Sequence, residues 1–323
     1  MSPGRSLEVV PYAPDHLGPA ATLFRDGVLR LRRRVPALPD ELTHAARARA
    51  LVEGFLREDR ALVALEGSTV VGYLGWWLVD GFRGTPRRAA YSPEFGHAAA
   101  PARAVEVELA LYHAATDHWT EAGCAVHALT CLAGQPALER AWFEDGFGLY
   151  VVDALRSMTP VSAPDPPGLT VRRALPADAA SVARLDVEHR HHYAVPPVSM
   201  APHAPDTAEG LAAFMAVEPD TIWLAEASGE TQAFLRLEPA SDGAAAISLA
   251  PTTISITGAF TRPACRGRGV AAALLAQAVD HYAARGFERM AVDYESFNPQ
   301  AAAFWPRFFD PVAVSVVRVP EHP

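Results

Sequence analysis

The sequence predicts two similar α/β domains in tandem, each a mixed, mostly antiparallel sheet flanked by helices. The chain has 323 residues, about twice the length of an ordinary single domain. Its halves also repeat one another, because Leu7 and Pro14 match Leu169 and Pro176 at a spacing of about 162 residues. Thr159–Gly168, between the halves, is rich in proline, which disfavours both helix and strand.

These observations predict a first domain over residues 1–158, a linker over 159–168 and a second domain over 169–323. The repeat continues downstream, where Trp142 and Trp305 keep the spacing to within one residue. Both halves are therefore expected to contain the same elements in the same order.

In the second half, apolar periodicity predicts a strand, a helix, a hairpin, a long strand, a helix, a strand, a helix and a final strand. The turns Ala227–Glu230 and Glu66–Thr69 support a hairpin in each half. The strands are expected at 169–175, 221–228, 231–238, 245–262, 289–295 and 312–319, and the helices at 178–193, 271–285 and 299–308.

A glycine-rich turn over Arg266–Ala271 carries the clearest functional signal. It follows the apolar run Ile254–Phe260 and opens the next helix, where unpaired backbone N–H groups and the positive end of the helix dipole converge. Glycine allows a close approach of the backbone, and the two arginines add charged donors. The segment predicts a phosphate or pyrophosphate site, with an ordinary surface turn as the alternative.

The spacing of this turn differs from that of the common phosphate loops. It lacks the Gly-Lys-Ser/Thr ending of nucleotide-triphosphate loops, and Ala272 stands where a dinucleotide fold has its third glycine. Arg266, Gly269 and Ala271 instead resemble the Gln/Arg-x-x-Gly-x-Gly/Ala signature of the GNAT acetyltransferases. Asn298–Trp305 is similar to that family's Asn-x-x-Ala-x-x-Phe/Leu-Tyr segment. The resemblance covers most of residues 169–319.

The resemblance implies a cofactor, acetyl-coenzyme A, and direct attack by an amine on its thioester in a ternary complex. By family pattern, the strand end over Ala259–Thr261 pairs with the pantetheine arm and Asn298 bonds to that arm. Asn298 before Pro299 is also a strong helix cap. The implied cofactor-binding residues are Ala259, Phe260, Thr261, Arg266, Gly267, Arg268, Gly269, Val270, Ala271 and Asn298.

Trp305 departs from the family pattern, because many members have a tyrosine there as the acid that protonates the thiolate. An indole N–H donates a hydrogen bond but does not usefully release its proton. Asp293 and Glu295 are candidate catalytic bases, since they lie two apart on one strand face and one carboxylate would raise the pKa of the other. Alternatively, they form salt bridges with Arg262 or Arg307.

Glu188, His191, His192 and Tyr193 end the first helix of the second domain, in the region that borders the acceptor site in the family. They are candidate substrate-binding residues, with a solvated helix end as the alternative. The segment from Ala194 to Glu218 contains prolines and apolar residues, and it predicts either a functional lid or a short helix packed in the core.

In the first half, Arg103–Glu108 stands opposite the glycine-rich turn. Both glycines are absent, and Glu106 and Glu108 would repel a phosphate. We therefore expect a degenerate first domain without a coenzyme A site. The alternative is that these acids simply begin a helix, where the dipole favours them.

Composition restricts the remaining function classes. The net charge of −9 and the absence of lysine argue against a nucleic-acid partner, although Arg30–Arg34 is a basic run. No apolar run reaches membrane-spanning length, and Met1–Arg5 lacks the apolar core of a signal peptide. The three cysteines, Cys124, Cys131 and Cys265, show no metal spacing and fit a reducing compartment.

The sequence thus predicts a cytoplasmic, acetyl-coenzyme A-dependent N-acyltransferase without a metal and without a membrane or nucleic-acid partner. A small-molecule amine is the expected acceptor, and the protein is a monomer or a homodimer. The alternative function is a non-catalytic acyl-coenzyme A sensor or scaffold, which Trp305 favours.

Overall fold

The computed structural model describes residues 6–241 and 243–321, so Met1–Arg5 lies outside the described residues. The chain forms two compact units. Unit 1 comprises Met1–Asp153, Ala245–Ser248 and Pro311–Pro323, and unit 2 comprises Ala154–Ala244 and Leu249–Asp310. The domain limits predicted from the repeat stay a prediction. The two compact units are defined by which residues pack together, and they place Pro311–Arg318 of β14 in unit 1.

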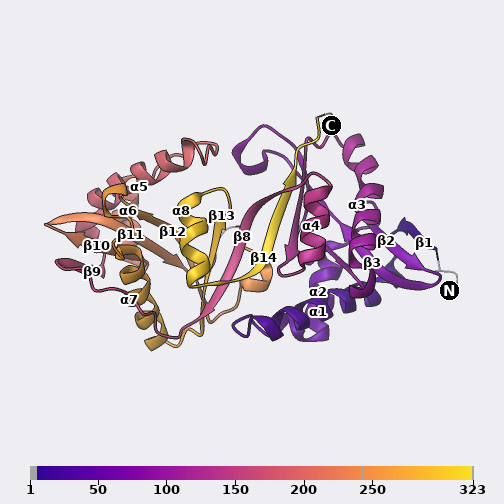
Figure 1. Cartoon of the computed structure of the whole chain (residues 1–323), viewed down its shortest axis with the longest axis horizontal. Coiled ribbons are helices and arrows are strands. Elements are labelled where there is room, and N and C mark those ends of the chain that lie inside the picture. The colour runs from indigo at the N-terminus through magenta and orange to yellow at the C-terminus, as the bar shows by residue number, and fades with distance from the viewer. Residues whose placement is uncertain (1–5, 242, 322–323) are drawn as a thin grey trace. The chain divides into compact units, whose positions relative to one another are not determined.

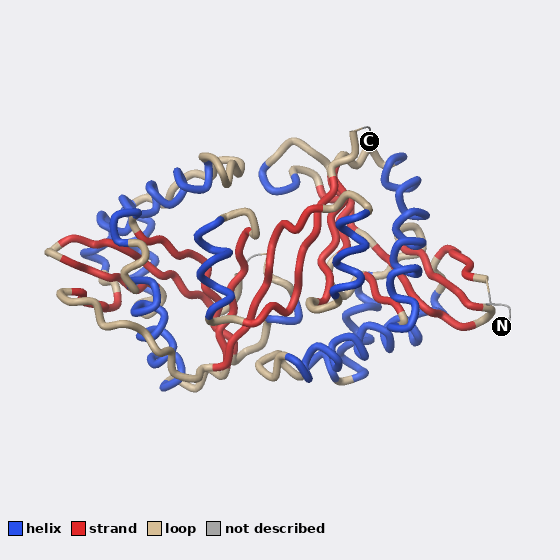
Figure 2. Tube along the Cα trace, in the orientation of Figure 1, coloured by secondary structure: helices blue, strands red, loops and turns tan. Residues whose placement is uncertain are grey.

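Unit 1 contains two groups of hydrogen-bonded strands with helices packed on them (Figures 1 and 2). The first group has the order β1-β2-β3-β6 and the second the order β4-β5-β7-β14, in which only β5 and β7 are parallel. The strands are β1 Leu7–Pro11, β2 Ala61–Glu66, β3 Thr69–Gly75, β4 Trp77–Val79, β5 Ala89–Ser92, β6 His97–Ala99, β7 Val126–Leu132 and β14 Asp310–Arg318. The helices are α1 Leu17–Arg34, α2 Ala45–Phe55, α3 Ala104–Glu121 and α4 Pro136–Glu144.

Unit 2 has the strand order β9-β10-β11-β12-β13, antiparallel except for the parallel pair of β12 and β13. The strands are β9 Leu169–Arg173, β10 Ile222–Ala227, β11 Glu230–Glu238, β12 Thr253–Thr261 and β13 Arg289–Glu295. The helices are α5 Ala179–Ala194, α6 Ala208–Val217, α7 Val270–Ala284 and α8 Pro299–Phe304. β8 Gly148–Ser157 lies partly in unit 1 and partly in unit 2.

Helices cover both faces of the unit 2 sheet. Successive side chains of a strand point to opposite faces, and apolar side chains on each face pack against a helix. On β10, Leu224 packs in a core cluster with Leu185 of α5 and Leu211 of α6. Its neighbour Trp223 points the other way and meets His281 of α7, with 5.1 Å between ring centroids. The predicted fold class, with mixed and mostly antiparallel sheets flanked by helices, is confirmed.

β12 and β13 are paired over only part of their length. Their register runs from Thr253 opposite Arg289 to Ile256 opposite Val292. β12 continues to Thr261 while bonded to β11 on its other edge. The two parallel strands therefore separate after Ile256.

Three predicted elements differ from the structure. The strand expected at 245–262 begins at Thr253, because the amides of Ala245 and Ile247 donate to the carboxylates of Asp153 and Glu94 (2.8 and 3.0 Å) instead of to a strand. The helix expected at 299–308 ends at Phe304, since Pro306 has no N–H to continue it, and a 3₁₀ turn follows.

The third difference lies in the segment from Ala194 to Glu218, where the short-helix alternative is correct for residues 208–217. Thr207 caps α6 by accepting a hydrogen bond from the Gly210 amide at 3.1 Å. Leu211 and Met215 are buried in the core of unit 2. Among the described helices, none is long and apolar enough to cross a membrane.

His127 on β7 is the basis of a pH-dependent stability in unit 1. Tyr112 donates a hydrogen bond from its hydroxyl to His127 Nδ1 (2.8 Å) and accepts one from Arg318 (3.0 Å). Burial, with a smaller effect of the Arg318 charge, lowers the pKa of His127 to about 4. In the unfolded chain this imidazole titrates near 6.5, so the unfolded state gains the proton first as the pH falls.

We therefore expect His127 to cause no loss of stability above about pH 6.5. Between pH 6.5 and pH 4, this residue should lower the free energy of unfolding by about 1.4 kcal/mol per pH unit. Urea unfolding, followed by tryptophan fluorescence at pH 7 and pH 5, measures this loss, because Trp119 packs on His127 at 4.8 Å between ring centroids. His127→Asn should lose less stability between these pH values than the wild type, whereas exposed His44→Gln should behave like the wild type. An unchanged pH dependence in His127→Asn would show that this residue is not responsible.

Candidate active site

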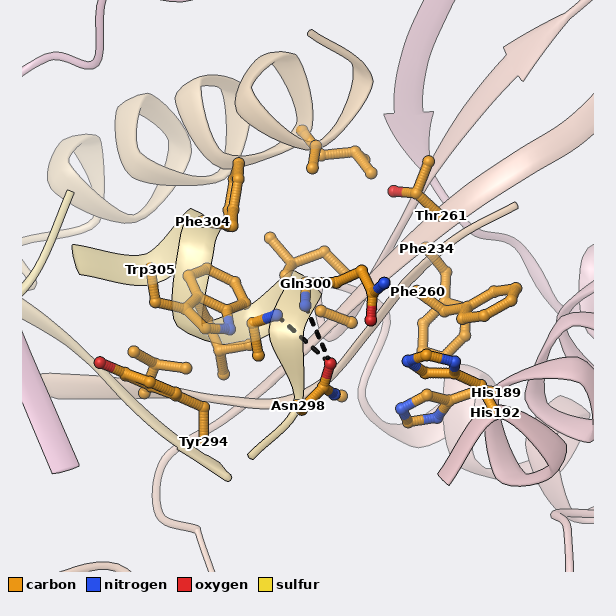
Figure 3. Close-up of a pocket in the computed structure, with 18 of the residues that line it drawn as sticks. His189, His192, Phe234, Phe260, Thr261, Tyr294, Asn298, Gln300, Phe304 and Trp305 are labelled. Carbon is orange, nitrogen blue, oxygen red and sulfur yellow. Dashed lines mark hydrogen bonds between the residues drawn. The ribbon is translucent and has the colours of Figure 1, made fainter. Parts of the chain in front are cut away.

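A cavity of about 640 Å³ lies in unit 2, where β12 and β13 separate. Its walls come from the last turn of α5, the ends of β12 and β13, the turn before α7, and α8 (Figure 3). Most of the residues predicted for the site line this cavity. They are Ala259, Phe260, Thr261, Arg266, Gly267, Gly269, Val270, Ala271, Asn298, Asp293, Glu295, Trp305, His192 and Tyr193.

The glycine-rich turn has the backbone geometry that requires glycine. Gly267 and Gly269 adopt left-handed φ angles of 74° and 83°, and Gly269 is the N-cap residue of α7. A Cβ on Gly269 would lie only 2.9 Å from the Pro164 ring, so this position also lacks room for a side chain. The first amides of α7 have no acceptor within the helix, and Gly269, Val270 and Ala271 at this point line the cavity beside Pro164.

The two arginines of this turn have different positions. Arg266 lines the cavity, where its Nε donates to the carbonyl of Thr261 at 2.9 Å and its guanidinium lies 5.6 Å from the centre of the Phe260 ring. Burial lowers its pKa. Arg268 is exposed and does not line the cavity, and its role in cofactor binding stays a prediction.

Asn298 is buried and caps α8, as predicted. Its Oδ1 accepts hydrogen bonds from the amides of Gln300 (3.2 Å) and Ala301 (3.4 Å). Asn298 also lines the cavity together with His192 and Tyr193 of α5. Figure 3 shows Asn298 between α8 and the histidines of α5.

The two acidic candidates on β13 both line the cavity. Asp293 accepts a hydrogen bond from Ser241 at 2.8 Å, and Glu295 is 9% exposed. Arg262, the salt-bridge partner considered for them, pairs with Glu188 (2.8 Å) and Glu230 (3.7 Å).

Trp305 closes one side of the cavity. Its side chain is 7% exposed and packs on Phe304 and Phe309, with 4.8 and 5.6 Å between ring centroids. Figure 3 shows the indole directed at the cavity from the end of α8. Trp305 thus contributes an apolar wall and one N–H donor.

The α5 candidates separate into two groups. His192 and Tyr193 line the cavity, whereas His191 is exposed and Glu188 is held by Arg262, and neither of these lines it. Burial lowers the pKa of His192, and the charge of Arg266 lowers it further. The imidazole is therefore neutral at physiological pH.

His189 is a cavity residue that our site prediction omitted. It packs at 5.0 Å from the Tyr193 ring, 5.7 Å from Phe234 and 5.9 Å from Phe260. A helix places residues three and four apart on one face, so the spacing of His189, His192 and Tyr193 could have revealed it.

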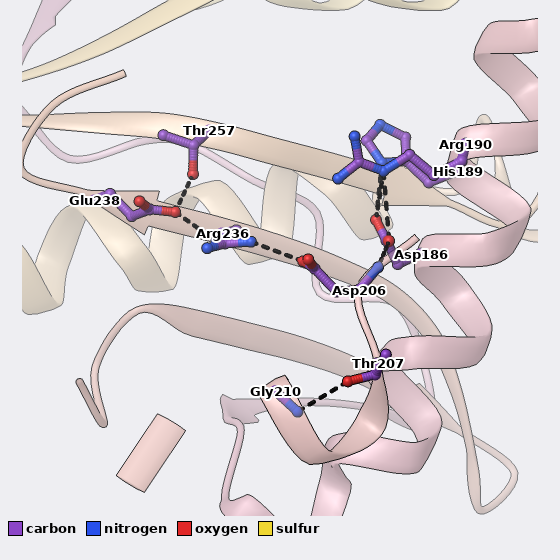
Figure 4. Close-up of polar contacts among 9 residues, drawn as sticks. All are labelled: Asp186, His189, Arg190, Asp206, Thr207, Gly210, Arg236, Glu238 and Thr257. Carbon is purple, nitrogen blue, oxygen red and sulfur yellow. Dashed lines mark hydrogen bonds and ion pairs between the residues drawn. The ribbon is translucent and has the colours of Figure 1, made fainter. Parts of the chain in front are cut away.

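The loop between α5 and α6 supplies a further wall that sequence reasoning did not place. Met200, Ala201 and His203 line the cavity. The end of this loop is anchored at Asp206, whose amide donates to Asp186 at 2.9 Å and whose carboxylate accepts from Arg236 at 3.0 Å (Figure 4).

The anchor extends across the sheet in a connected polar network (Figure 4). Arg236 pairs with Glu238, which also accepts a hydrogen bond from Thr257 at 2.9 Å. The guanidinium of Arg236 lies 4.6 Å from the centre of the Phe214 ring on α6. These contacts hold the loop and α6 against β11, so this wall of the cavity is built into the fold.

Unit 1 has polar side chains at the positions that correspond to the cavity. In the repeat register, His97 matches Phe260, Glu108 matches Ala271 and Thr130 matches Asp293. His97 Nδ1 bonds to the Glu108 carboxylate at 3.0 Å, and its Nε2 bonds to the Thr130 carbonyl at 2.9 Å. All three residues are buried.

Burial opposes the charge on His97, but the Glu108 carboxylate and Cys131 together outweigh it and raise the pKa of His97 well above its ordinary value. The prediction that both Glu106 and Glu108 stand at a phosphate position is therefore wrong for Glu108, which points into the interior. Glu106 remains at the start of α3 and pairs with Arg103, which also pairs with Glu66 at 2.7 Å. His97 and Glu108 thus join β6, α3 and β7.

Comparison with known proteins supports a family assignment. A family model described as the acetyltransferase (GNAT) family matches residues 188–309. No curated protein matches the chain. The match contains the whole of the glycine-rich turn and Asn298.

Among solved structures, the fold resembles a GCN5-related N-acetyltransferase from Sphaerobacter thermophilus. The TM-score is 0.57 at 16% identity, covering 98% of this chain and 96% of that one. A GNAT-family acetyltransferase from Colwellia psychrerythraea has a TM-score of 0.46 at 11% identity, covering 97% and 98%. A tandem GNAT protein from the clavulanic acid biosynthesis pathway has a TM-score of 0.45 at 14% identity, covering 97% of each chain.

The predicted resemblance to the GNAT family of acetyltransferases is thus confirmed over residues 188–309.

Proposed function

We propose that unit 2 is an acetyl-coenzyme A-dependent N-acyltransferase that acetylates a small-molecule amine. The observation that carries this proposal is the glycine-rich turn at the start of α7, which opens into a cavity between two separating strands. Its volume lies within the usual range for small-ligand sites.

The residues present fit the expected cofactor. The amides of residues 267–271 and the guanidinium of Arg266 are donors suited to a pyrophosphate. The edge of β12 over Ala259–Thr261 faces away from β11 and is suited to pair with the amide-containing pantetheine arm. Bound acetyl-coenzyme A supplies an activated acetyl group as a thioester.

The acceptor amine reacts only when it is neutral, so the chain must take up its proton. Asp293 and Glu295 are carboxylates on the cavity wall, and His192 is a neutral imidazole there. Each is a chemically suitable acceptor for that proton, and the two acids remain our candidate bases. The wall formed by Met200, Ala201 and His203 would then contact the amine.

We propose that unit 1 does not bind coenzyme A. Where unit 2 has Phe260 and Ala271 on the cavity wall, unit 1 has the buried pair of His97 and Glu108. A pyrophosphate at the start of α3 would also meet the Glu106 carboxylate, which costs free energy. Unit 1 then serves a structural role.

A non-catalytic sensor of acyl-coenzyme A is the second candidate, and Trp305 favours it because an indole cannot protonate a thiolate. A thiol-release assay with acetyl-coenzyme A and a broad panel of amines separates the two. The transferase predicts thiol release that depends on the amine. Binding of acetyl-coenzyme A in calorimetry, with no release for any amine, would instead establish the sensor.

Gly269→Glu tests the cofactor site. The new carboxylate would face the pyrophosphate, and repulsion of a few kcal/mol at an effective dielectric near 20 predicts a loss of coenzyme A affinity of about 100-fold or more in calorimetry.

Gly286→Glu is the matched control, because Gly286 has a similar φ of 86° and no neighbouring atom within 4 Å of an added Cβ. Both variants strain a left-handed glycine by about 1–2 kcal/mol, and Gly269→Glu should lose further stability because its Cβ would lie 2.9 Å from the Pro164 ring. Only Gly269→Glu should lose affinity. Retained affinity in this variant would refute the assignment of the glycine-rich turn.

A further inference from the structure

The part of the cavity that faces α5 is built from other residues than the glycine-rich turn. Phe260 of β12 lies opposite Phe234 of β11, and both side chains pack in the core cluster with residues of α5 and α6. Gly258 is two residues before Phe260, so it lies on the same face of the sheet. The proposed cofactor site uses the turn before α7 and the edge of β12, which leaves the α5 side for the acceptor amine.

Four rings form a wall on this side of the cavity. The His189 ring lies 5.7 Å from Phe234 and 5.9 Å from Phe260 between centroids, and His192 lies 6.4 Å from Phe260. Figure 3 shows these four rings together, on the opposite side of the cavity from Trp305. Such a wall favours a flat apolar group, because aromatic pairs gain free energy beyond the burial of their area.

Gly258 leaves open space beside this wall. It lines the cavity and lies opposite Arg236 in the strand register. A Cβ added to Gly258 would lie 3.4 Å from the Phe234 ring, which is an ordinary contact, so the backbone does not require glycine here. A longer side chain would extend into the cavity and occupy space that a ring of the acceptor needs.

The acidic side chains give the acceptor side a negative charge. Asp293 and Glu295 line the cavity, and the Ser241 hydroxyl that donates to Asp293 is neutral. Arg190 also lines the cavity, but it pairs with the buried Asp186 at 3.2 Å. One proton acceptor is enough for one amine, so at least one carboxylate keeps its charge. This charge attracts a protonated amine and repels a carboxylate on the acceptor.

Two further arginines line the cavity in the described part of the chain. Arg266 lies 5.6 Å from the centre of the Phe260 ring, but in the proposed cofactor site its charge faces the pyrophosphate. Arg307 is exposed and follows α8, with its guanidinium 5.3 Å from the centre of the Phe308 ring. With coenzyme A bound, the charge that meets the acceptor is therefore that of the acids on β13.

We propose that the acceptor is an amine with an aromatic ring and without a carboxylate, and that Gly258 is a specificity-determining residue for it. The ring lies against His189 and Phe260 beside Gly258, and the amine points towards Asp293 and Glu295. Amino acids carry a carboxylate next to the amine and are poor acceptors. This inference rests on the proposed transferase function and names the substrate class of the same site.

Ligands that differ in one group test the two parts of this assignment. In calorimetry on the protein saturated with coenzyme A, phenethylamine should bind about tenfold or more tightly than phenylalanine, which adds only a carboxylate. Propylamine, which lacks the ring, should also bind about tenfold or more weakly than phenethylamine. Asp293→Asn should reduce the preference for phenethylamine over phenylalanine severalfold, because it removes one of the two charges.

Gly258→Leu tests the space for the ring. It should weaken the binding of phenethylamine about tenfold or more and leave the affinity for coenzyme A unchanged, because the added side chain lies on the α5 side of β12. Gly148→Leu is the matched control, since Gly148 also lies in a strand, is exposed and does not line the cavity. This variant should keep the wild-type affinity for both ligands.

The acceptor assignment and the proposed function fail in different ways. Equal binding of phenethylamine and phenylalanine, no binding of phenethylamine, or unchanged affinity in Gly258→Leu would overturn the acceptor class, while the binding of coenzyme A would leave the cofactor site intact. If the wild-type protein does not bind coenzyme A, the proposed function and the acceptor class are both wrong.

Discussion

The separation of β12 and β13 is the constraint on which the site depends. The two strands are parallel and hydrogen-bond only between Thr253–Ile256 and Arg289–Val292. Beyond that stretch, the backbone N–H and C=O groups on the facing edges of the two strands no longer bond to one another. Buried backbone groups of this kind need another hydrogen-bond partner. A ligand with its own amides satisfies such an edge, and the cavity at this point has room for one.

The two halves of the chain differ in what they place at the equivalent point. Unit 1 joins β6 to β7 through His97, which bonds to the Thr130 carbonyl and is itself held by Glu108. Unit 2 has Phe260 and Ala271 at the positions of His97 and Glu108, and these apolar side chains leave the backbone edge accessible. The two units therefore have a buried polar pair and an apolar cavity wall at equivalent positions.

Local sequence patterns predicted much of the second half. β13 has the expected limits, Asn298 caps α8, and Gly269 adopts the left-handed conformation at the start of α7. Each depends on residues close together in sequence, such as an asparagine before a proline or a glycine before an apolar helix. The resemblance over Arg266–Ala271 then indicated the GNAT family, whose model matches residues 188–309.

The features that were missed depend on contacts between distant residues. Glu108 was expected at a phosphate position, but its bond to His97 draws it into the interior. The 245–248 segment was expected in a strand, but carboxylates of unit 1 bind its amides. Likewise, the loop that carries Met200 becomes a cavity wall only because Asp206 bonds to α5 and β11. The periodicity of apolar residues along a sequence does not show which distant side chains and amides bond to one another.

We expect one chain to bind one acetyl-coenzyme A, in unit 2. A crystal structure of the protein with acetyl-coenzyme A would test this expectation. We expect pyrophosphate density at the amides of residues 267–271 and none at the start of α3. Density against Arg103–Glu108, or a cofactor bound away from the glycine-rich turn, would contradict it.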